Sequence, residues 1–210
     1  MAGIGSSGEL LLMNRILYRS WTGLEEGEWL AGHMSLFDTE TGALDTVASY
    51  DHWPGNPPGL PANPIQAVGE VTVATGQFVY TRSDRPEITW RLPDGTVTRI
   101  VRWRAEPTRL TEELLEPVEA YQRMMTQINN RGIPMSRIEE MTQISMSWRY
   151  AMIGQPMPLY GSPFADADGN VWLASYRLAY PEEGSPYTVI PRTGSGWDRL
   201  RLRPGSESSM

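Results

Sequence analysis

The segment from residue 163 to residue 204 constrains the fold of this chain more than any other, because turn signals alternate in it with short runs of strand formers. The run DADGN at 166–170 collects residues whose side chains bond their own backbone or accept a positive φ, and VWLASY follows it directly. Two further runs, YTVI and WDRLRL, each follow another turn. Three strands in about forty residues have the spacing of an antiparallel meander.

The same pattern of strand, glycine turn and strand recurs upstream. Gly42 separates WLAGHMSLF from ALDTVASY, Gly76 separates EVTVA from QFVYT, and Gly95 separates EITWR from TVTRIVRW. Each pair is typical of a hairpin with its glycine at the turn. The turn glycines do not recur at one fixed period, so the repeat is weaker than that of a strict array. The pattern predicts a mainly β fold with about ten strands.

The D-x-D-G-N-x-W run at 166–172, together with the hairpin that ends at Gly194, resembles bacterial six-bladed β-propeller proteins related to the NHL-repeat and virginiamycin-lyase-like propellers. The run EITWRLPDGTVTRIVRW looks like a preceding blade of the same group. The resemblance covers residues 28–104 and 160–204. It implies a β-propeller whose blades are antiparallel meanders, and a β-sandwich is the alternative that the strand pattern leaves open.

The number of strands is too small for the ring that the resemblance implies. Six four-stranded blades need roughly two dozen strands, about twice what the pattern supplies. The resemblance therefore implies a partial propeller with about half of the ring present. Because an open arc exposes edges that proteins normally close or cover, we expect a fragment of a longer chain, self-association that completes the ring, or blades that pack in another way.

Residues 111–155 break the β pattern and predict an α-helical hairpin inserted between strands. Apolar residues recur there at helical spacing, and a glycine and a proline near the middle supply a stop. We expect helices at 117–130 and 137–147, with Pro117 in the first turn of the first helix. A capping box that begins at Ser136 is expected to open the second helix.

The chain therefore divides into a first set of blades at 1–110, the hairpin at 111–155, a C-terminal blade at 156–205 and a disordered tail at 206–210. Seven of the eleven methionines, at positions 124, 125, 135, 141, 146, 152 and 157, lie in or just after the hairpin. Methionine-rich faces sometimes serve adaptable binding surfaces. The plainer interpretation is that these side chains pack the hairpin onto the blades, and the functional one makes the hairpin a lid or a docking platform.

Composition excludes several kinds of chemistry. The chain has no cysteine, so thiolate nucleophiles and thiolate metal sites are absent, and every basic residue is arginine, which excludes a lysine Schiff base. With only His33 and His52, no two-histidine zinc motif occurs. The sequence also has no G-x-S-x-G nucleophile elbow, no phosphate-binding G-x-x-x-x-G-K-[ST] motif and no dinucleotide-binding G-x-G-x-x-G motif after an expected strand. The run 166–170 opens like a Ca²⁺ loop but lacks its glycine and its bidentate glutamate. We expect no cofactor and no metal site.

Charge and hydropathy constrain the partners. The formal net charge of −7 disfavours a nucleic-acid surface, and no apolar run approaches the length of a membrane span or of a signal peptide. We expect no nucleic-acid partner and no membrane span, and a protein partner or a second copy as the binding partner. We expect the cytoplasm if the chain is complete, and the periplasm or export if it is a truncated form of a longer parent, because relatives of the propeller group are often exported.

The best candidates for a ligand contact are Trp53 and His52, at the root of the Pro- and Gly-rich run 54–64. That run is too long for a hairpin turn and indicates a linker or a loop at the propeller mouth. His52 beside Asp51 is the candidate acid–base pair, since virginiamycin-lyase-like enzymes use a histidine for elimination, although no matching motif surrounds it. The sequence favours a non-catalytic scaffold that binds a protein or a small ligand, and a lactonase-like propeller hydrolase or lyase is the alternative.

Overall fold

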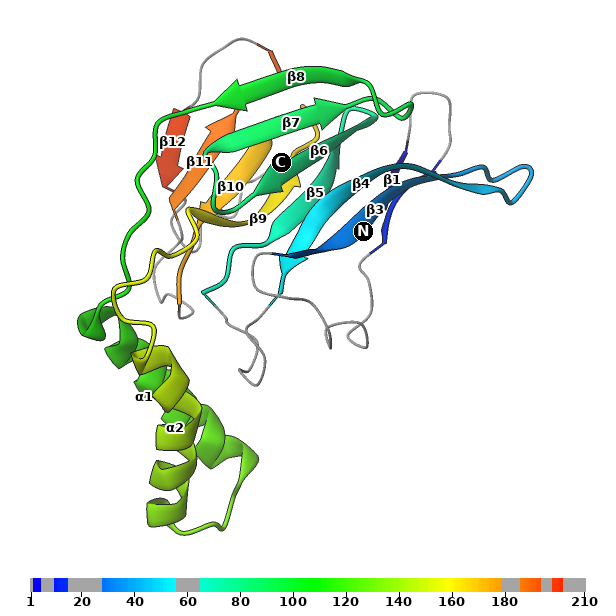
Figure 1. The fold of residues 1–210 in the computed structure, drawn as a ribbon. Coiled ribbons are helices and arrows are strands. Elements are labelled where there is room, and N and C mark those ends of the chain that lie inside the picture. The colour runs from blue at the N-terminus through cyan, green and yellow to red at the C-terminus, as the bar shows by residue number, and fades with distance from the viewer. Residues whose placement is uncertain are drawn as a thin grey trace, which may run out of the picture.

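The computed structural model describes residues 2–4, 10–14, 28–55, 65–178, 186–193 and 198–201. These residues form three four-stranded antiparallel sheets and one pair of helices (Figure 1). In each sheet the strands pair in chain order, so each sheet is a simple meander. The expected mainly β fold with a helical insertion is confirmed. The expected tail at 206–210 and most of the loop at 54–64 lie outside the described residues.

The first sheet contains β1 (Ala2–Ile4), β2 (Leu10–Asn14), β3 (Trp29–Phe37) and β4 (Leu44–Pro54). The second contains β5 (Gly69–Ala74), β6 (Gln77–Arg82), β7 (Glu87–Arg91) and β8 (Val97–Arg102). The third contains β9 (Tyr160–Ala165), β10 (Val171–Ser175), β11 (Pro186–Ile190) and β12 (Asp198–Arg201). The strand pattern of the sequence does not identify β1, β2 or β9, because β1 is very short and β9 contains both glycine and proline.

The second sheet lies between the other two, and its strands β5, β6 and β7 have buried residues on both faces. Phe78 and Val79 are consecutive in β6, so their side chains point to opposite faces of the sheet, and both are fully buried. Phe78 packs with side chains of the first sheet, among them Leu11 and Met34. Val79 packs in a separate core with side chains of the third sheet, such as Leu173. The second sheet therefore links two cores that have no residue in common.

The first and second sheets approach each other closely at Gly69, the first residue of β5. A Cβ atom added to Gly69 would lie 1.6 Å from the carbonyl oxygen of Asp51 in β4. Such a contact is with backbone, which cannot rotate away as a flexible side chain would. Only glycine fits at this position while the two sheets keep their spacing.

We predict that Gly69→Ala lowers the free energy of unfolding by about 3 kcal/mol, because the added methyl group forces β4 and β5 apart. Gly161→Ala is the matched control, since an added Cβ at Gly161 meets nothing within 4 Å and that residue also lies in a strand. Urea denaturation of both variants measures the difference. Equal stability of the two variants would contradict the close approach of the sheets.

Helix α1 (Glu112–Asn129) begins five residues before the expected start. Thr111 caps it by accepting the backbone N–H of Leu114 at 3.4 Å, and two glutamates in the first turn interact favourably with the helix dipole. Pro117 therefore lies inside the helix, and the prediction that it occupies the first turn is wrong. Because proline has no backbone N–H, α1 lacks one helical hydrogen bond at Pro117.

Helix α2 (Met135–Tyr150) has Pro134 as its N-cap residue and no side-chain cap. The Pro134 carbonyl oxygen accepts the backbone N–H groups of Arg137 and Ile138 at 2.9 and 3.2 Å. The predicted capping box is wrong, because Ser136 lies within the first turn and not before it. Proline at this position ends the preceding loop by its fixed φ and costs no helical hydrogen bond.

The two helices form an arm that projects from the sheets (Figure 1). At its base, Leu115, Val118 and Met146 pack with residues that flank the strands, including Leu110 and Met157. Further out, Ile138 is buried, together with Thr126 and Thr142, whose hydroxyl groups bond the carbonyl oxygen four residues earlier in their own helix. Within the described residues, no helix combines the length and the apolar character needed to cross a bilayer.

Four of the seven methionines in or just after the hairpin fall into two groups, and the other three are half-buried. Met146 and Met157 are buried at the base and hold the arm on the sheets, as the packing interpretation expects. Met124 and Met135 are exposed on the outer part of the arm, where they contribute to apolar surface. Packing on the sheets therefore accounts for the methionines at the base alone.

Candidate functional site

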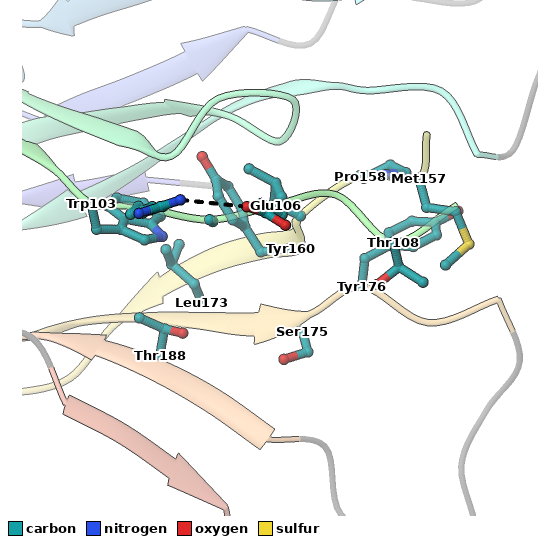
Figure 2. A pocket seen from close by; sticks show the side chains of 13 residues that line it. Trp103, Glu106, Thr108, Met157, Pro158, Tyr160, Leu173, Ser175, Tyr176 and Thr188 are labelled. Atoms are coloured by element: carbon teal, nitrogen blue, oxygen red, sulfur yellow. Dashed lines mark ion pairs between the residues drawn. The ribbon is translucent and has the colours of Figure 1, made fainter. Parts of the chain in front are cut away.

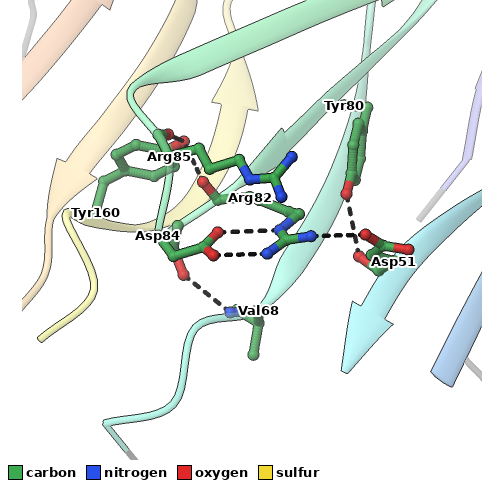
Figure 3. A network of polar contacts seen from close by, with 8 residues as sticks. Asp51, Val68, Tyr80, Arg82, Asp84, Arg85 and Tyr160 are labelled. Atoms are coloured by element: carbon green, nitrogen blue, oxygen red, sulfur yellow. Dashed lines mark hydrogen bonds and ion pairs between the residues drawn. The ribbon is translucent and has the colours of Figure 1, made fainter. Parts of the chain in front are cut away.

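A network of polar contacts around Arg82, the last residue of β6, joins the first and second sheets (Figure 3). Its Nη1 atom donates to Asp51 in β4 at 2.7 Å, and its Nε and Nη2 atoms donate to the two carboxylate oxygens of Asp84 at 3.0 and 2.6 Å. The guanidinium lies 3.9 Å from the centre of the Trp29 ring. Burial opposes the charge of Arg82, but its two aspartate partners outweigh that cost and raise the pKa of the guanidinium.

Tyr160, at the start of β9, extends this network to the third sheet (Figure 3). Its hydroxyl group lies 2.6 Å from the carbonyl oxygens of Arg82 and Arg85 and 2.5 Å from the Thr81 hydroxyl. Burial raises the pKa of Tyr160, so the hydroxyl keeps its proton and donates it to these carbonyls. One buried phenol thus fixes the turn between β6 and β7 against the third sheet.

We predict that Tyr160→Phe lowers the free energy of unfolding by about 1–2 kcal/mol, because buried carbonyl oxygens lose a donor that water cannot replace. Tyr187→Phe in β11 is the matched control, because no hydrogen bond of its hydroxyl is found among the described residues. Urea denaturation compares the two. A loss in Tyr187→Phe as large as that in Tyr160→Phe would contradict the assigned role.

The three residues singled out in the sequence lie side by side at the end of β4. Asp51 is paired with Arg82, and Nδ1 of His52 lies 2.8 Å from the carbonyl oxygen of Gly69. Since a carbonyl oxygen only accepts, Nδ1 carries the proton and Nε2 is the acceptor in the neutral ring. The rings of His52 and Trp53 meet edge to face. The contact of Trp53 and His52 with a ligand stays a prediction.

The structure contains a cavity of about 310 Å³ between the second and third sheets, next to the base of the arm (Figure 2). Tyr160 and Leu173 form buried parts of its wall, and Trp103 packs beside Tyr160 with ring centres 5.8 Å apart. At the mouth, Arg104 and Glu106 form an exposed ion pair at 3.8 Å. Exposed pairs of this kind contribute little, so the mouth of the cavity is not locked.

The far wall of this cavity is polar. Ser175 in β10 and Thr188 in β11 line it, and neither hydroxyl bonds another side chain within the described residues. Tyr176 also lines it, and burial raises the pKa of its phenol to about 12, so it remains a hydrogen-bond donor at neutral pH. Aromatic walls with a few hydroxyl groups suit a small amphipathic molecule. None of Asp51, His52 and Trp53 lines this cavity.

A second cavity, of about 410 Å³, lies where the first sheet, the segment that precedes β5 and the base of the arm meet. Its wall is mostly apolar and includes Trp29, Ile65 and Met152. The carboxylate of Asp84 is its charged group, and that carboxylate is already bound by Arg82. Across the parts of the chain that the structure describes, no three histidine or acidic side chains gather closely enough to hold a metal ion.

The 166–170 segment forms the turn between β9 and β10. Gly169 has φ of 83° and its N–H donates to the Asp166 carbonyl oxygen, while the Asp166 carboxylate accepts from the Asn170 side chain at 2.9 Å and from the Trp172 indole at 2.7 Å. Although partial burial opposes ionisation, these hydrogen bonds lower the pKa of Asp166. Its oxygens are thus engaged in the turn.

We predict that Asp166→Asn destabilises the protein at pH 7 and that the difference from the wild type shrinks as the pH falls below about 4. A carboxylate whose pKa is lowered by folding stabilises the folded state above its unfolded pKa, and this contribution is lost as the carboxylate is protonated. Urea denaturation at pH 7 and pH 3 measures it. A difference that is constant across this range would contradict the role of the charge.

Sequence reasoning missed Arg82 and Tyr160 as the residues that join the three sheets. The contacts of Arg82 with Asp51 and of Tyr160 with Arg82 link positions 31 and 78 residues apart. No local pattern predicts pairs at such separations. The local signal was the spacing of Arg82 and Asp84, which places the last residue of β6 and a residue of the following turn close enough to form an ion pair.

Comparison with protein-family models and with curated proteins finds no match to the chain.

Proposed function

We propose that this chain is a non-catalytic binding scaffold, made of three consecutive propeller-type blades, which holds a protein partner through its helical arm. One observation carries the proposal. The arm projects from the sheets and bears most of the large apolar side chains that are exposed in the described residues (Figure 1). Exposed apolar side chains gathered on one element are typical of surfaces that bind other proteins.

Three features of the sheets support the propeller interpretation. Each sheet has four antiparallel strands in chain order, as a propeller blade has. Successive sheets pack face against face, so that the middle sheet is buried on both sides. The twelve strands would supply half of a six-bladed ring. In this interpretation Arg82 and Tyr160 are contacts between blades.

The alternative, a propeller-type hydrolase or lyase, needs a histidine and carboxylates that converge on a cavity. In the described residues, His52 bonds a backbone carbonyl group and Asp51 forms an ion pair with Arg82. Neither residue lines either cavity described above. These contacts favour the scaffold over the enzyme.

We predict that a photo-crosslinking amino acid placed at Met124, on the arm, captures a protein in cells that make this chain. Val97 in β8 is the matched control, because its exposed fraction of 43% nearly equals the 45% of Met124. A product from position 124 that is absent from position 97 supports the proposal. Capture at neither position, or equal capture at both, would show that the arm is not the docking element.

A further inference from the structure

One face of helix α1 presents an apolar stripe with the spacing of a coiled coil. Its members are exposed, and each is three or four residues from the next. They are Leu114, Pro117, Tyr121, Met124 and Ile128. Steps of three, four, three and four residues correspond to the a and d positions of two heptads. The buried residues of α1, Leu115, Val118 and Thr126, lie on a different face, where Leu115 and Val118 pack in one cluster with Met146 of α2.

The stripe is therefore additional to the contact that holds the hairpin together. A helix turns by 100° per residue, so the stripe is centred roughly a third of a turn away from the face that α2 covers. Leu114, Tyr121, Met124 and Ile128 are between 36% and 48% exposed. An a/d stripe of this kind is buried in coiled coils by a second helix with the same spacing.

The charges along α1 select the direction of such a pairing. The N-terminal half carries four glutamates, whereas Arg123 lies in the C-terminal half, where it pairs with Glu119 at 2.9 Å, and Arg131 follows the C-terminal end. The glutamates are Glu112, Glu113, Glu116 and Glu119. The ends of α1 lie about 27 Å apart, so these groups do not meet within one chain. In a parallel pair the glutamates would face each other, but in an antiparallel pair each acidic end meets the arginine of the other copy.

We infer that two copies of this chain associate through α1, as an antiparallel pair in which Tyr121 packs opposite Met124 of the second copy. In this register Leu114 packs opposite Arg131 of the second copy, whose guanidinium reaches Glu113. The acidic N-terminal half of α1 disfavours an anionic membrane as the occupant of the stripe. The inference rests on the proposed role of the arm as the docking element and names its partner.

Pairing through α1 differs from association that completes a propeller ring. A ring would be closed by strands of the sheets, whereas this contact lies along α1, on the arm (Figure 1). Two heptads bury less area than a standard protein interface, so the dimer is expected to dissociate in the micromolar range.

Sedimentation velocity of the purified full chain, from about 1 µM to about 200 µM, tests the inference. We expect a monomer at the lowest concentrations and a dimer at the highest. Ile128→Arg should weaken the dimer at least about tenfold. Ile144→Arg is the matched control, because Ile144 lies on α2 outside the stripe and is 65% exposed, and it should leave the dimer unchanged.

A charge exchange tests the antiparallel arrangement and does not depend on a core substitution. Glu113→Arg and Arg131→Glu should each weaken the dimer severalfold, and the double variant should recover most of the loss, because both ion pairs form again with reversed sign.

A monomer at every concentration, a dimer that Ile128→Arg does not weaken, or a double variant no better than the single ones would overturn the inference. The photo-crosslinking experiment separates this result from the proposed function. A product of another protein's mass at position 124, with a monomer in sedimentation, would refute pairing of two copies and leave the docking role of the arm intact.

Discussion

The burial of the second sheet on both faces is the constraint on which the rest of the structure depends. A strand with one buried face needs apolar residues at alternate positions, whereas Phe78 and Val79 in β6 are consecutive and both fully buried. This requires a neighbouring sheet on each side. Three contacts then fix the positions of the neighbouring sheets. Arg82 forms an ion pair with Asp51 of the first sheet, and the absence of a side chain at Gly69 lets that sheet approach closely. The hydroxyl group of Tyr160, in the third sheet, bonds the carbonyl oxygen of Arg82.

The same arrangement explains why the arm is the outlying element. The sheets bury their apolar faces against one another, and the chain between β8 and β9 leaves them to form two helices. Among the described residues, these helices pack near their base with segments that flank the strands. The outer part of the arm holds itself together with small contacts such as those of Thr126 and Thr142. Apolar side chains on its outer faces therefore have no sheet to cover them.

Local chemistry accounts for what could be predicted from the sequence. Glycine turns and alternating strand formers identified most strands of all three sheets, and the change to helical spacing identified the insertion. The predicted starts of both helices, at 117 and 137, are wrong. Thr111 is the N-cap of α1 and Pro134 is the N-cap residue of α2, so both helices begin earlier. The contacts between sheets were missed because Tyr160 binds residues more than seventy positions away.

The central sheet contributes to two cores, whereas each outer sheet contributes to one. Hydrogen exchange of single backbone amides in native buffer tests this difference most directly. We expect the backbone amides of β6 to exchange only through global unfolding. The amides of β3 and β11, in the sheets on either side, should also exchange through smaller, local openings. Exchange of β6 as fast as that of β3 and β11 would contradict the central position of the second sheet.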